Sequence, residues 1–155
     1  MDDRVTAVAA AVETAVESLV SVLDAARLAQ EPAVPPAQLR VLTIIAANQH
    51  TNMSRLAESL DVVPSSASRL CDRLEATGLL RRVPDPRDRR EVRLLLTPAA
   101  RRLLDDLRER RLRALAEVLE RMPAPARQEF VHALTAFAEA AEAGPAGADS
   151  GRRTA

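Results

Sequence analysis

The sequence predicts a mainly α-helical fold with one small β-hairpin. Apolar residues recur every three or four positions over most of the chain, which is the period of a helix with one buried face. The stretch from residue 79 to residue 96 departs from that period and has turn-forming residues in its middle. The apolar residues are mostly Ala, Val and Leu, with no Trp or Tyr and two Phe, which disfavours a large β-sandwich. A length of 155 residues with 47% hydrophobic side chains suits one domain, or a small domain with an oligomerising extension.

Two helices are expected before residue 48. The first covers residues 5 to 28, with an apolar stripe formed by Val5, Val8, Val12, Val16, Leu19, Leu23 and Ala26. A cluster of prolines ends it, at Pro32, Pro35 and Pro36. The second helix covers about residues 36 to 47, because proline is tolerated in the first turn of a helix.

Two shorter helices follow, separated by a break. After a polar turn at residues 48 to 52, residues 53 to 60 give one apolar stripe over two helical turns. Residues 61 to 63 break the pattern, Pro64 takes a first-turn position, and a helix runs from there to Gly78. Its inward stripe is Ala67, Leu70, Cys71 and Leu74. Gly78 is the only glycine before residue 144, and we expect it to end the helix in the left-handed conformation.

A hairpin and two longer helices complete the prediction. Strands at residues 79 to 83 and 91 to 96 flank a charged loop. Thr97 is the expected N-cap of a helix that Pro98 opens and that extends to about residue 121. A last helix has a stripe predicted to be buried, formed by Phe130, Leu134, Phe137 and Ala141. Residues 144 to 155 are rich in Gly, Ala and Ser and are predicted to be a disordered tail.

This order of elements indicates a winged helix-turn-helix in the middle of the chain. Residues 36 to 97 supply two helices, a turn, a further helix and the hairpin, as that arrangement requires. Residues 1 to 35 and 98 to 143 contribute the flanking N-terminal and C-terminal helices.

The charges are balanced overall but unevenly distributed. The chain has 22 basic residues, all of them Arg, and 22 acidic residues, so its formal net charge is zero. Residues 69 to 113 hold 14 Arg against 8 acidic residues, a net charge of +6, and the rest of the chain has a net charge of −6. A basic stretch is often only a solvated face, so charge by itself does not identify nucleic acid as the partner.

The helix that starts at Pro64 carries the first set of candidate site residues. In a helix-turn-helix the second helix places short polar or basic side chains of its N-terminal part in the DNA major groove. The outward positions are Ser65, Ser66, Ser68, Arg69 and Arg73. Ser hydroxyls can bond base edges or phosphates, Arg69 can bind guanine through two hydrogen bonds, and Arg73 lies one turn later, where it suits a phosphate.

The hairpin loop carries the second set. It contains Arg87, Arg89 and Arg90 together with Asp85 and Asp88. Stability does not explain such a cluster, because exposed ion pairs contribute on the order of 1 kcal/mol or less. An Arg on a narrow tip suits the negative potential of the DNA minor groove, and the neighbouring Asp residues can hold it extended.

The run LAESLDVVPSSASRLCDRLEATGLLRRVPDPRDRREVRLLL, followed by Thr97 and Pro98, resembles the MarR family of bacterial transcriptional regulators. The DPRDRR loop and the Leu-Thr-Pro helix start are its most specific parts, and the resemblance covers roughly residues 36 to 140. It implies that the helix from Pro64 reads the major groove and that the wing tip enters the minor groove. The residues implied in these contacts are Pro64, Ser65, Ser66, Ser68, Arg69 and Arg73 on the helix, and Arg87, Arg89 and Arg90 with Asp88 in the wing.

The sequence departs from the family pattern at two positions. The residue before Pro64 is commonly Ser or Thr in the family, but the side chain of Val63 cannot accept a hydrogen bond from a backbone N–H, so the helix is expected to start without a side-chain cap. Where the family often has Gly after the Leu-Thr-Pro-Ala run, this chain has Ala100, which favours the helix.

The resemblance also implies a dimer and a ligand. The flanking helices of two subunits would interlock into a homodimer that binds palindromic double-stranded DNA, although a monomer could instead bury them against its own core. Many relatives bind small anionic aromatic compounds between the dimer helices and the DNA-binding domain, and the ligand shifts the separation of the two DNA-reading helices. The resemblance therefore implies a repressor released by a small molecule, although the residues themselves do not distinguish a repressor from an activator. Arg27, Arg40 and His50 could line such a pocket, but each is also consistent with an ordinary surface residue. Cys71 lies on the inward stripe and is predicted to be an inert small hydrophobe without a redox role.

Other classes of protein fit less well. A single Cys excludes an internal disulfide or a multi-Cys zinc site, and two distant His residues argue against a metal, so no cofactor is expected. No arrangement of nucleophile and base and no Gly-rich phosphate loop suggests an enzyme. An acidic N-terminus and the lack of an apolar run of about 20 residues favour a cytoplasmic protein that does not enter a membrane. The alternative is a helical dimeric interaction module whose winged motif binds protein.

Overall fold

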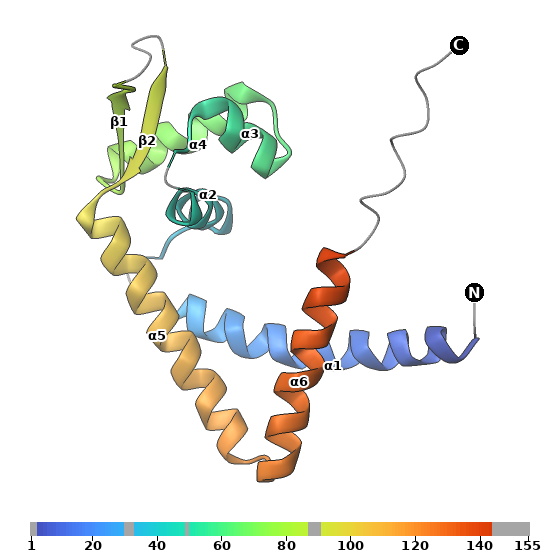
Figure 1. Ribbon diagram of the computed structural model, residues 1–155. Coiled ribbons are helices and arrows are strands. Elements are labelled where there is room, and N and C mark those ends of the chain that lie inside the picture. Colours follow the sequence, from blue (N-terminus) through green and yellow to red (C-terminus); the bar gives the residue numbers. More distant parts are fainter. Residues whose placement is uncertain (1–2, 30–32, 49, 87–90, 144–155) are drawn as a thin grey trace, which may run out of the picture. The chain divides into compact units, whose positions relative to one another are not determined.

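The computed structural model describes residues 3–29, 33–48, 50–86 and 91–143. Within these ranges the chain forms six helices and one two-stranded antiparallel sheet (Figure 1). In chain order the elements are α1 (Asp3–Leu28), α2 (Pro36–Ala47), α3 (Met53–Leu60), α4 (Pro64–Ala76), β1 (Leu80–Pro84), β2 (Val92–Leu96), α5 (Pro98–Glu120) and α6 (Ala124–Glu142). The predicted order of helices and hairpin is confirmed. The chain divides into two compact units, Met1–Ala114 and Leu115–Ala155, and the predicted tail from residue 144 lies outside the described residues.

The core of the first unit lies between α2, α3, α4 and the hairpin. Its largest fully buried side chains are aliphatic apart from one thiol: Val41, Leu42, Leu56, Cys71, Leu74, Leu80 and Leu94. The first half of α5 adds Ala100, Leu103 and Leu107. Burial of each Leu contributes about 1.5–3 kcal/mol, so this cluster holds the three short helices and the hairpin together.

The sheet has a contact that the sequence did not predict. β1 pairs with β2 from Leu80 opposite Leu96 to Pro84 opposite Val92. Residues just before α3 join the free edge of β2, where Asn52 forms a bridge with Arg93 and the Leu94 N–H donates to the Thr51 carbonyl at 3.0 Å. The polar turn between α2 and α3 is therefore attached to the second strand of the wing.

The helix ends follow the local chemistry of the sequence. Gly78 has φ 72°, which confirms the predicted left-handed stop after α4. Asp61 ends α3 in the same conformation, with φ 54°. The Asn52 side chain caps α3 by accepting from the Arg55 N–H at 2.9 Å. Val63 precedes α4 with no side-chain cap, as predicted.

Thr97 joins the hairpin to α5. Its Oγ1 accepts from the Ala100 N–H at 3.2 Å, which confirms the predicted N-cap. The same hydroxyl donates to the Gly78 carbonyl at 2.7 Å, just past the end of α4. One buried hydroxyl therefore bonds the two segments that flank the hairpin.

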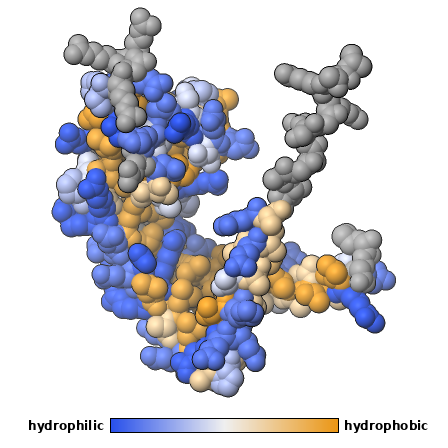
Figure 2. Space-filling model, in the orientation of Figure 1, coloured by the Kyte–Doolittle hydropathy of each residue, from blue (hydrophilic) through white to orange (hydrophobic). Residues whose placement is uncertain are grey.

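The apolar stripes of α1 and α6 are not buried within the single chain. In α1 only Ala26 is buried, whereas Val8 is 62% exposed and Val16 is 42% exposed; Figure 2 shows apolar surface along this helix. In α6 no residue is buried and Phe137 is 65% exposed. The prediction that the apolar stripe of the last helix is buried is therefore wrong within a single chain. The periodicity indicates an apolar face, but it does not indicate which surface covers that face.

By length and composition alone, α1 could also cross a membrane. The sequence was expected to have no apolar run near the roughly 20 residues that span a bilayer. Judged by length and composition, α1 shows that this expectation is wrong. Glu13 and Glu17 lie within the helix, and a charged side chain near the centre of a bilayer costs about 2.5–3.5 kcal/mol. A single such helix is weak evidence of a membrane span.

Candidate nucleic-acid interface

The second helix of the motif, α4, presents three different faces. The first is buried in the core, the second lies along β1, and the third is directed away from both. Because the helical repeat is 3.6 residues, members of each face recur at spacings of three or four. The core face comprises Ala67, Cys71 and Leu74, the β1 face comprises Ser68, Asp72 and Glu75, and the outward face comprises Ser65, Arg69 and Arg73.

The outward face carries the predicted cations in an accessible position. Arg69 and Arg73 are exposed and lie one turn apart, and neither forms an ion pair with another residue in the described ranges. Pro64 and Ser65 are exposed in the first turn of the helix, and Ser66 is half-buried beside them. The two guanidinium groups can therefore donate to an external acceptor such as a phosphate or a guanine edge.

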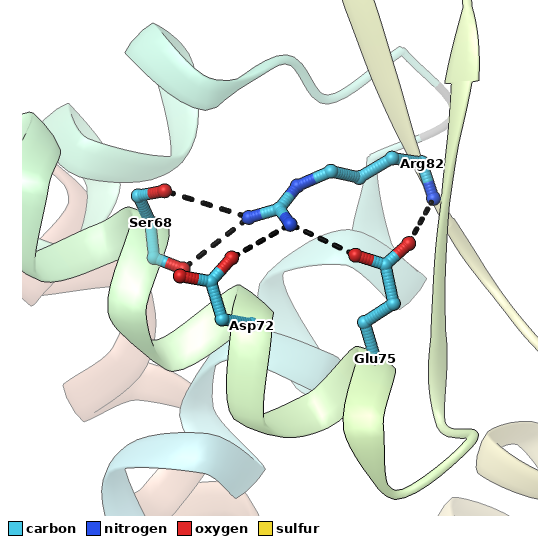
Figure 3. Close-up of polar contacts among 4 residues, drawn as sticks. All are labelled: Ser68, Asp72, Glu75 and Arg82. Carbon is cyan, nitrogen blue, oxygen red and sulfur yellow. Dashed lines mark hydrogen bonds and ion pairs between the residues drawn. The ribbon is translucent and has the colours of Figure 1, made fainter.

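Ser68 does not share that outward face. It is half-buried, and its Oγ lies 3.5 Å from Nη2 of Arg82 on β1 (Figure 3). Ser68 was predicted to share a face with Ser65 and Arg69, but the rotation of about 100° per residue from Arg69 directs it toward the hairpin. Ser68 is thus in a poorer position than Ser65 or Arg69 to reach a base.

Arg82 connects β1 to the β1 face of α4 through several contacts. Its Nη1 lies 2.7 Å from Asp72 Oδ1 and 2.8 Å from Glu75 Oε2, and its Nη2 donates to the Ser68 carbonyl at 3.3 Å (Figure 3). Its backbone N–H also donates to Glu75 Oε1 at 3.3 Å. Arg82 was not among the residues predicted from the sequence, although the spacings of four and three between Ser68, Asp72 and Glu75 indicate a polar face on α4 that needs a partner.

The charge of Arg82 is stabilised by its partners. Burial disfavours a charged guanidinium, but the hydrogen bond to Asp72 and the charges of Asp72 and Glu75 outweigh that effect and raise the pKa of Arg82 above its usual value. Arg82 therefore remains charged throughout the pH range in which proteins are folded. It offsets part of the negative charge that α4 would otherwise present beside Arg69 and Arg73.

A second polar cluster fixes the base of the wing. The Asp85 N–H donates to the Glu91 carbonyl at 2.9 Å, and Arg93 Nε lies 3.7 Å from Asp85 Oδ2. Arg93 Nη2 also lies 2.9 Å from His50 Nδ1, and Asn52 Nδ2 donates to Glu91 Oε2 at 3.1 Å. These contacts join both strand ends to the segment that precedes α3.

The wing-tip candidates Arg87, Asp88, Arg89 and Arg90 lie outside the described residues. The structure describes the strand ends that flank them, where Pro84 pairs with Val92. The roles of the four residues in DNA binding remain predictions.

The three ligand candidates lie on different segments. His50 lines a cavity of about 470 Å³ together with residues of α2 and α3, including Ile44 and Arg55. Neither Arg27 nor Arg40 lines this cavity. Arg27 pairs with Asp24 on α1 at 3.3 Å, and Arg40 is exposed on α2. In the described part of the chain, no three His, Cys, Asp or Glu residues are grouped to hold a metal ion.

Cys71 has the inward position that the sequence predicted. Its side chain lies on the core face of α4 and is fully buried. Burial raises the pKa of the thiol from 9.0 to about 11, although the nearby charge of Arg82 acts in the opposite direction. The thiol is therefore protonated at neutral pH, and a protonated thiol is a poor nucleophile.

A short two-helix motif with an exposed cationic second helix, backed by a β-hairpin, defines a winged helix-turn-helix protein. The sequence model of the MarR family matches residues 34–92. RV1404 from Mycobacterium tuberculosis, known from a crystal structure, is 33% identical to this chain, with a TM-score of 0.81 over 88% of this chain and 93% of that one. The chain belongs to the MarR family and is a transcriptional regulator of that type.

Two further relatives agree with this assignment. The HTH-type transcriptional repressor MdtR of Bacillus subtilis (strain 168) is 29% identical over 113 residues, which is 73% of each chain. A MarR family protein from Bacillus stearothermophilus shares the fold, with a TM-score of 0.77 and 22% identity over 92% of this chain and 99% of that one. The resemblance proposed from the DPRDRR loop and the helix that precedes it is confirmed.

Proposed function

We propose that this regulator binds double-stranded DNA sequence-specifically, with α4 in the major groove. The observation that carries the proposal is the outward face of α4, where Ser65, Arg69 and Arg73 are exposed and neither Arg is paired with a described residue. Arg69 is placed to bind a guanine edge, and Arg73 to bind a phosphate one turn further along. Pro64, Ser66 and Ser68 complete the proposed contact segment, with Ser68 in a supporting position beside Arg82.

The wing supplies the second contact in this proposal. Arg87, Arg89 and Arg90 would reach the minor groove beside the segment read by α4, and Asp88 would orient them. The described base of the wing supports this assignment, because Asp85 and Arg93 are held on either side of the loop by contacts to each other and to His50.

We also propose that the protein acts as a homodimer. The exposed Val residues of α1 and the exposed Phe137 of α6 are apolar surfaces that a single chain leaves open to water. A second copy is the partner that the family assignment favours. Twofold symmetry would then match a palindromic operator with half-sites about one helical turn, or about 10 base pairs, apart.

The proposed output is repression relieved by a ligand. MdtR is a transcriptional repressor by name, and the cavity beside His50 is of a size that small molecules occupy. A small anionic aromatic compound is the ligand class we propose. Because a protein that binds an operator must reach cellular DNA, we propose that it is cytoplasmic.

The decisive experiment selects duplexes from a random library and then compares the wild type with Arg69→Ala on the selected operator. We expect Arg69→Ala to weaken binding about tenfold or more and to relax the preference at one base position, since a two-bond Arg–guanine contact contributes about 1–3 kcal/mol of discrimination. Wild-type affinity should fall with salt at a log–log slope of about −0.9 per phosphate neutralised.

Arg81→Ala is the matched control, because Arg81 is exposed on β1 and lies outside the outward face of α4. It should leave the base preference unchanged. If the wild type binds duplexes only at millimolar concentration, with no palindromic preference, the proposal fails and the winged motif must instead serve a protein partner.

A further inference from the structure

We propose that Arg82 is a positioning residue that holds the wing and α4 at one fixed angle, so that both can reach DNA together. The inference deepens the proposed function and rests on it. Arg82 need not contact DNA itself. It acts through the β1 face of α4, which lies beside the outward face that carries Arg69 and Arg73.

The contacts of Arg82 differ from those of an ordinary surface ion pair. A single guanidinium spans Ser68, Asp72 and Glu75, which cover two turns of α4, and the backbone N–H of the same residue binds Glu75 again (Figure 3). Within the described ranges, all hydrogen bonds and ion pairs between α4 and β1 involve Arg82. The Arg82 side chain is about one quarter exposed, whereas Asp72 is 58% and Glu75 42% exposed, so the role of the cluster rests on its number of contacts and not on burial of the charges.

The position of Arg82 along β1 explains why a tie is needed there. Leu80 anchors the start of the strand in the core, being 1% exposed. Beyond it the strand leaves the core, and Pro84 at its end is exposed. Arg82 lies two residues past Leu80, or about 7 Å along the strand, toward the wing tip. The wing is also held through β2, whose free edge is attached to Thr51 and Asn52, but those contacts lead to the segment before α3. Arg82 adds a direct polar tie between the wing and α4.

A simpler explanation would be that Arg82 only neutralises Asp72 and Glu75, which would otherwise repel phosphates. The two explanations predict opposite changes in DNA affinity when the carboxylates of Asp72 and Glu75 are removed. Without Asp72 and Glu75 the net charge of the protein rises by two, so neutralisation alone predicts tighter DNA binding. Positioning predicts weaker binding, because Arg82 has lost its partners on α4.

The test uses the full-length double variant Asp72→Ala/Glu75→Ala on the selected operator, with affinity and hydroxyl-radical footprints as readouts. Alanine is a strong helix former, so α4 should persist, and thermal unfolding checks that it does. We expect affinity to fall about tenfold and minor-groove protection beside each half-site to disappear, while the base preference set by Arg69 is kept. Unchanged or tighter binding, or intact minor-groove protection, would overturn the inference.

Arg82→Lys gives a second, charge-conserving variant. A lysine ammonium lacks the planar fork that lets one guanidinium reach several acceptors, so we expect it to lose most of the minor-groove protection as well. Arg81→Lys on the same strand is the control and should bind within about twofold of the wild type. If Arg82→Lys keeps full protection, the positioning role is refuted. A wild type that binds no duplex would instead contradict the proposed function.

Discussion

Ser68 and Arg69 are adjacent in sequence, but they have different surroundings. Arg69 is exposed on the outward face of α4, whereas the Ser68 hydroxyl lies beside the Arg82 guanidinium. At the residue scale, α4 therefore has one set of exposed side chains and another set held against β1. In our proposals Arg69 belongs to the set that contacts a base, and Asp72 and Glu75, with Arg82, set the angle of the helix.

Cys71 allows a residue-scale prediction about pH. The sequence has no Lys and no Tyr, so Cys71 is its only side chain with an ordinary pKa between 8 and 11. Burial raises the pKa of the thiol from 9.0 to about 11, so the unfolded chain loses this proton at lower pH than the folded chain does. The free energy of unfolding should therefore fall as pH rises from about 9 to about 11, by roughly 2–3 kcal/mol.

Urea unfolding at a series of pH values measures this effect. Cys71→Ala is the control and should show no such fall over the same window, although it will be less stable at every pH because it leaves a small cavity. A wild-type curve that stays level above pH 9, or a variant that falls equally, would contradict the assignment of the effect to the thiol.

At the scale of elements, α3 and α4 begin in different ways. The first turn of α3 is capped by the Asn52 side chain, but Val63 gives α4 no cap and is itself 62% exposed. The first turn of α4 therefore has one side-chain hydrogen bond fewer than the first turn of α3.

Val63→Ser should stabilise the protein. A serine hydroxyl can accept from a free first-turn amide, and little buried apolar surface is lost at so exposed a position, so we expect a gain of about 1 kcal/mol in the free energy of unfolding. Urea or thermal unfolding measures the change. Val62→Ser changes the neighbouring exposed valine without supplying an N-cap and should give no gain; equal effects at both positions would argue against capping as the cause.

The ends of these elements were predictable because local chemistry determines them. Gly78, Pro64 and Thr97 act within a turn or two of their own positions, and the structure confirms all three. The tie between Arg82 and α4 was not predicted, because it joins residues 7 to 14 positions apart whose proximity depends on the hairpin packing against the helix. The outward position predicted for Ser68 rested on its residue type, which suits a DNA contact, whereas its helical phase directs it toward Arg82.

At the scale of the whole molecule, the two terminal segments have a common property. Each carries an apolar face that the single chain does not bury, on α1 in one unit and on α6 in the other. Periodicity correctly indicated these faces. It could not show whether the same chain or a second chain covers them.

We therefore expect the purified protein to have a mass twice the 16.8 kDa of one chain in sedimentation equilibrium. Val12→Glu places a charge on the exposed apolar face of α1 and should shift the protein toward monomer, because burying an unpaired carboxylate costs several kcal/mol. Ser21→Glu adds the same charge nine residues later, on the opposite side of the helix, and should leave the mass unchanged. A monomeric wild type would refute the homodimer.

The Thr97 hydroxyl affects how the molecule opens to solvent. Because this oxygen binds both the Gly78 carbonyl and the Ala100 N–H, the first turn of α5 cannot fray without also releasing the end of the turn that follows α4. Amide protons at helix ends usually exchange early, through small local openings. We therefore expect the Ala100 amide proton to exchange through a larger opening that also breaks the bond between Thr97 and Gly78, and so more slowly than an ordinary amide at a helix end.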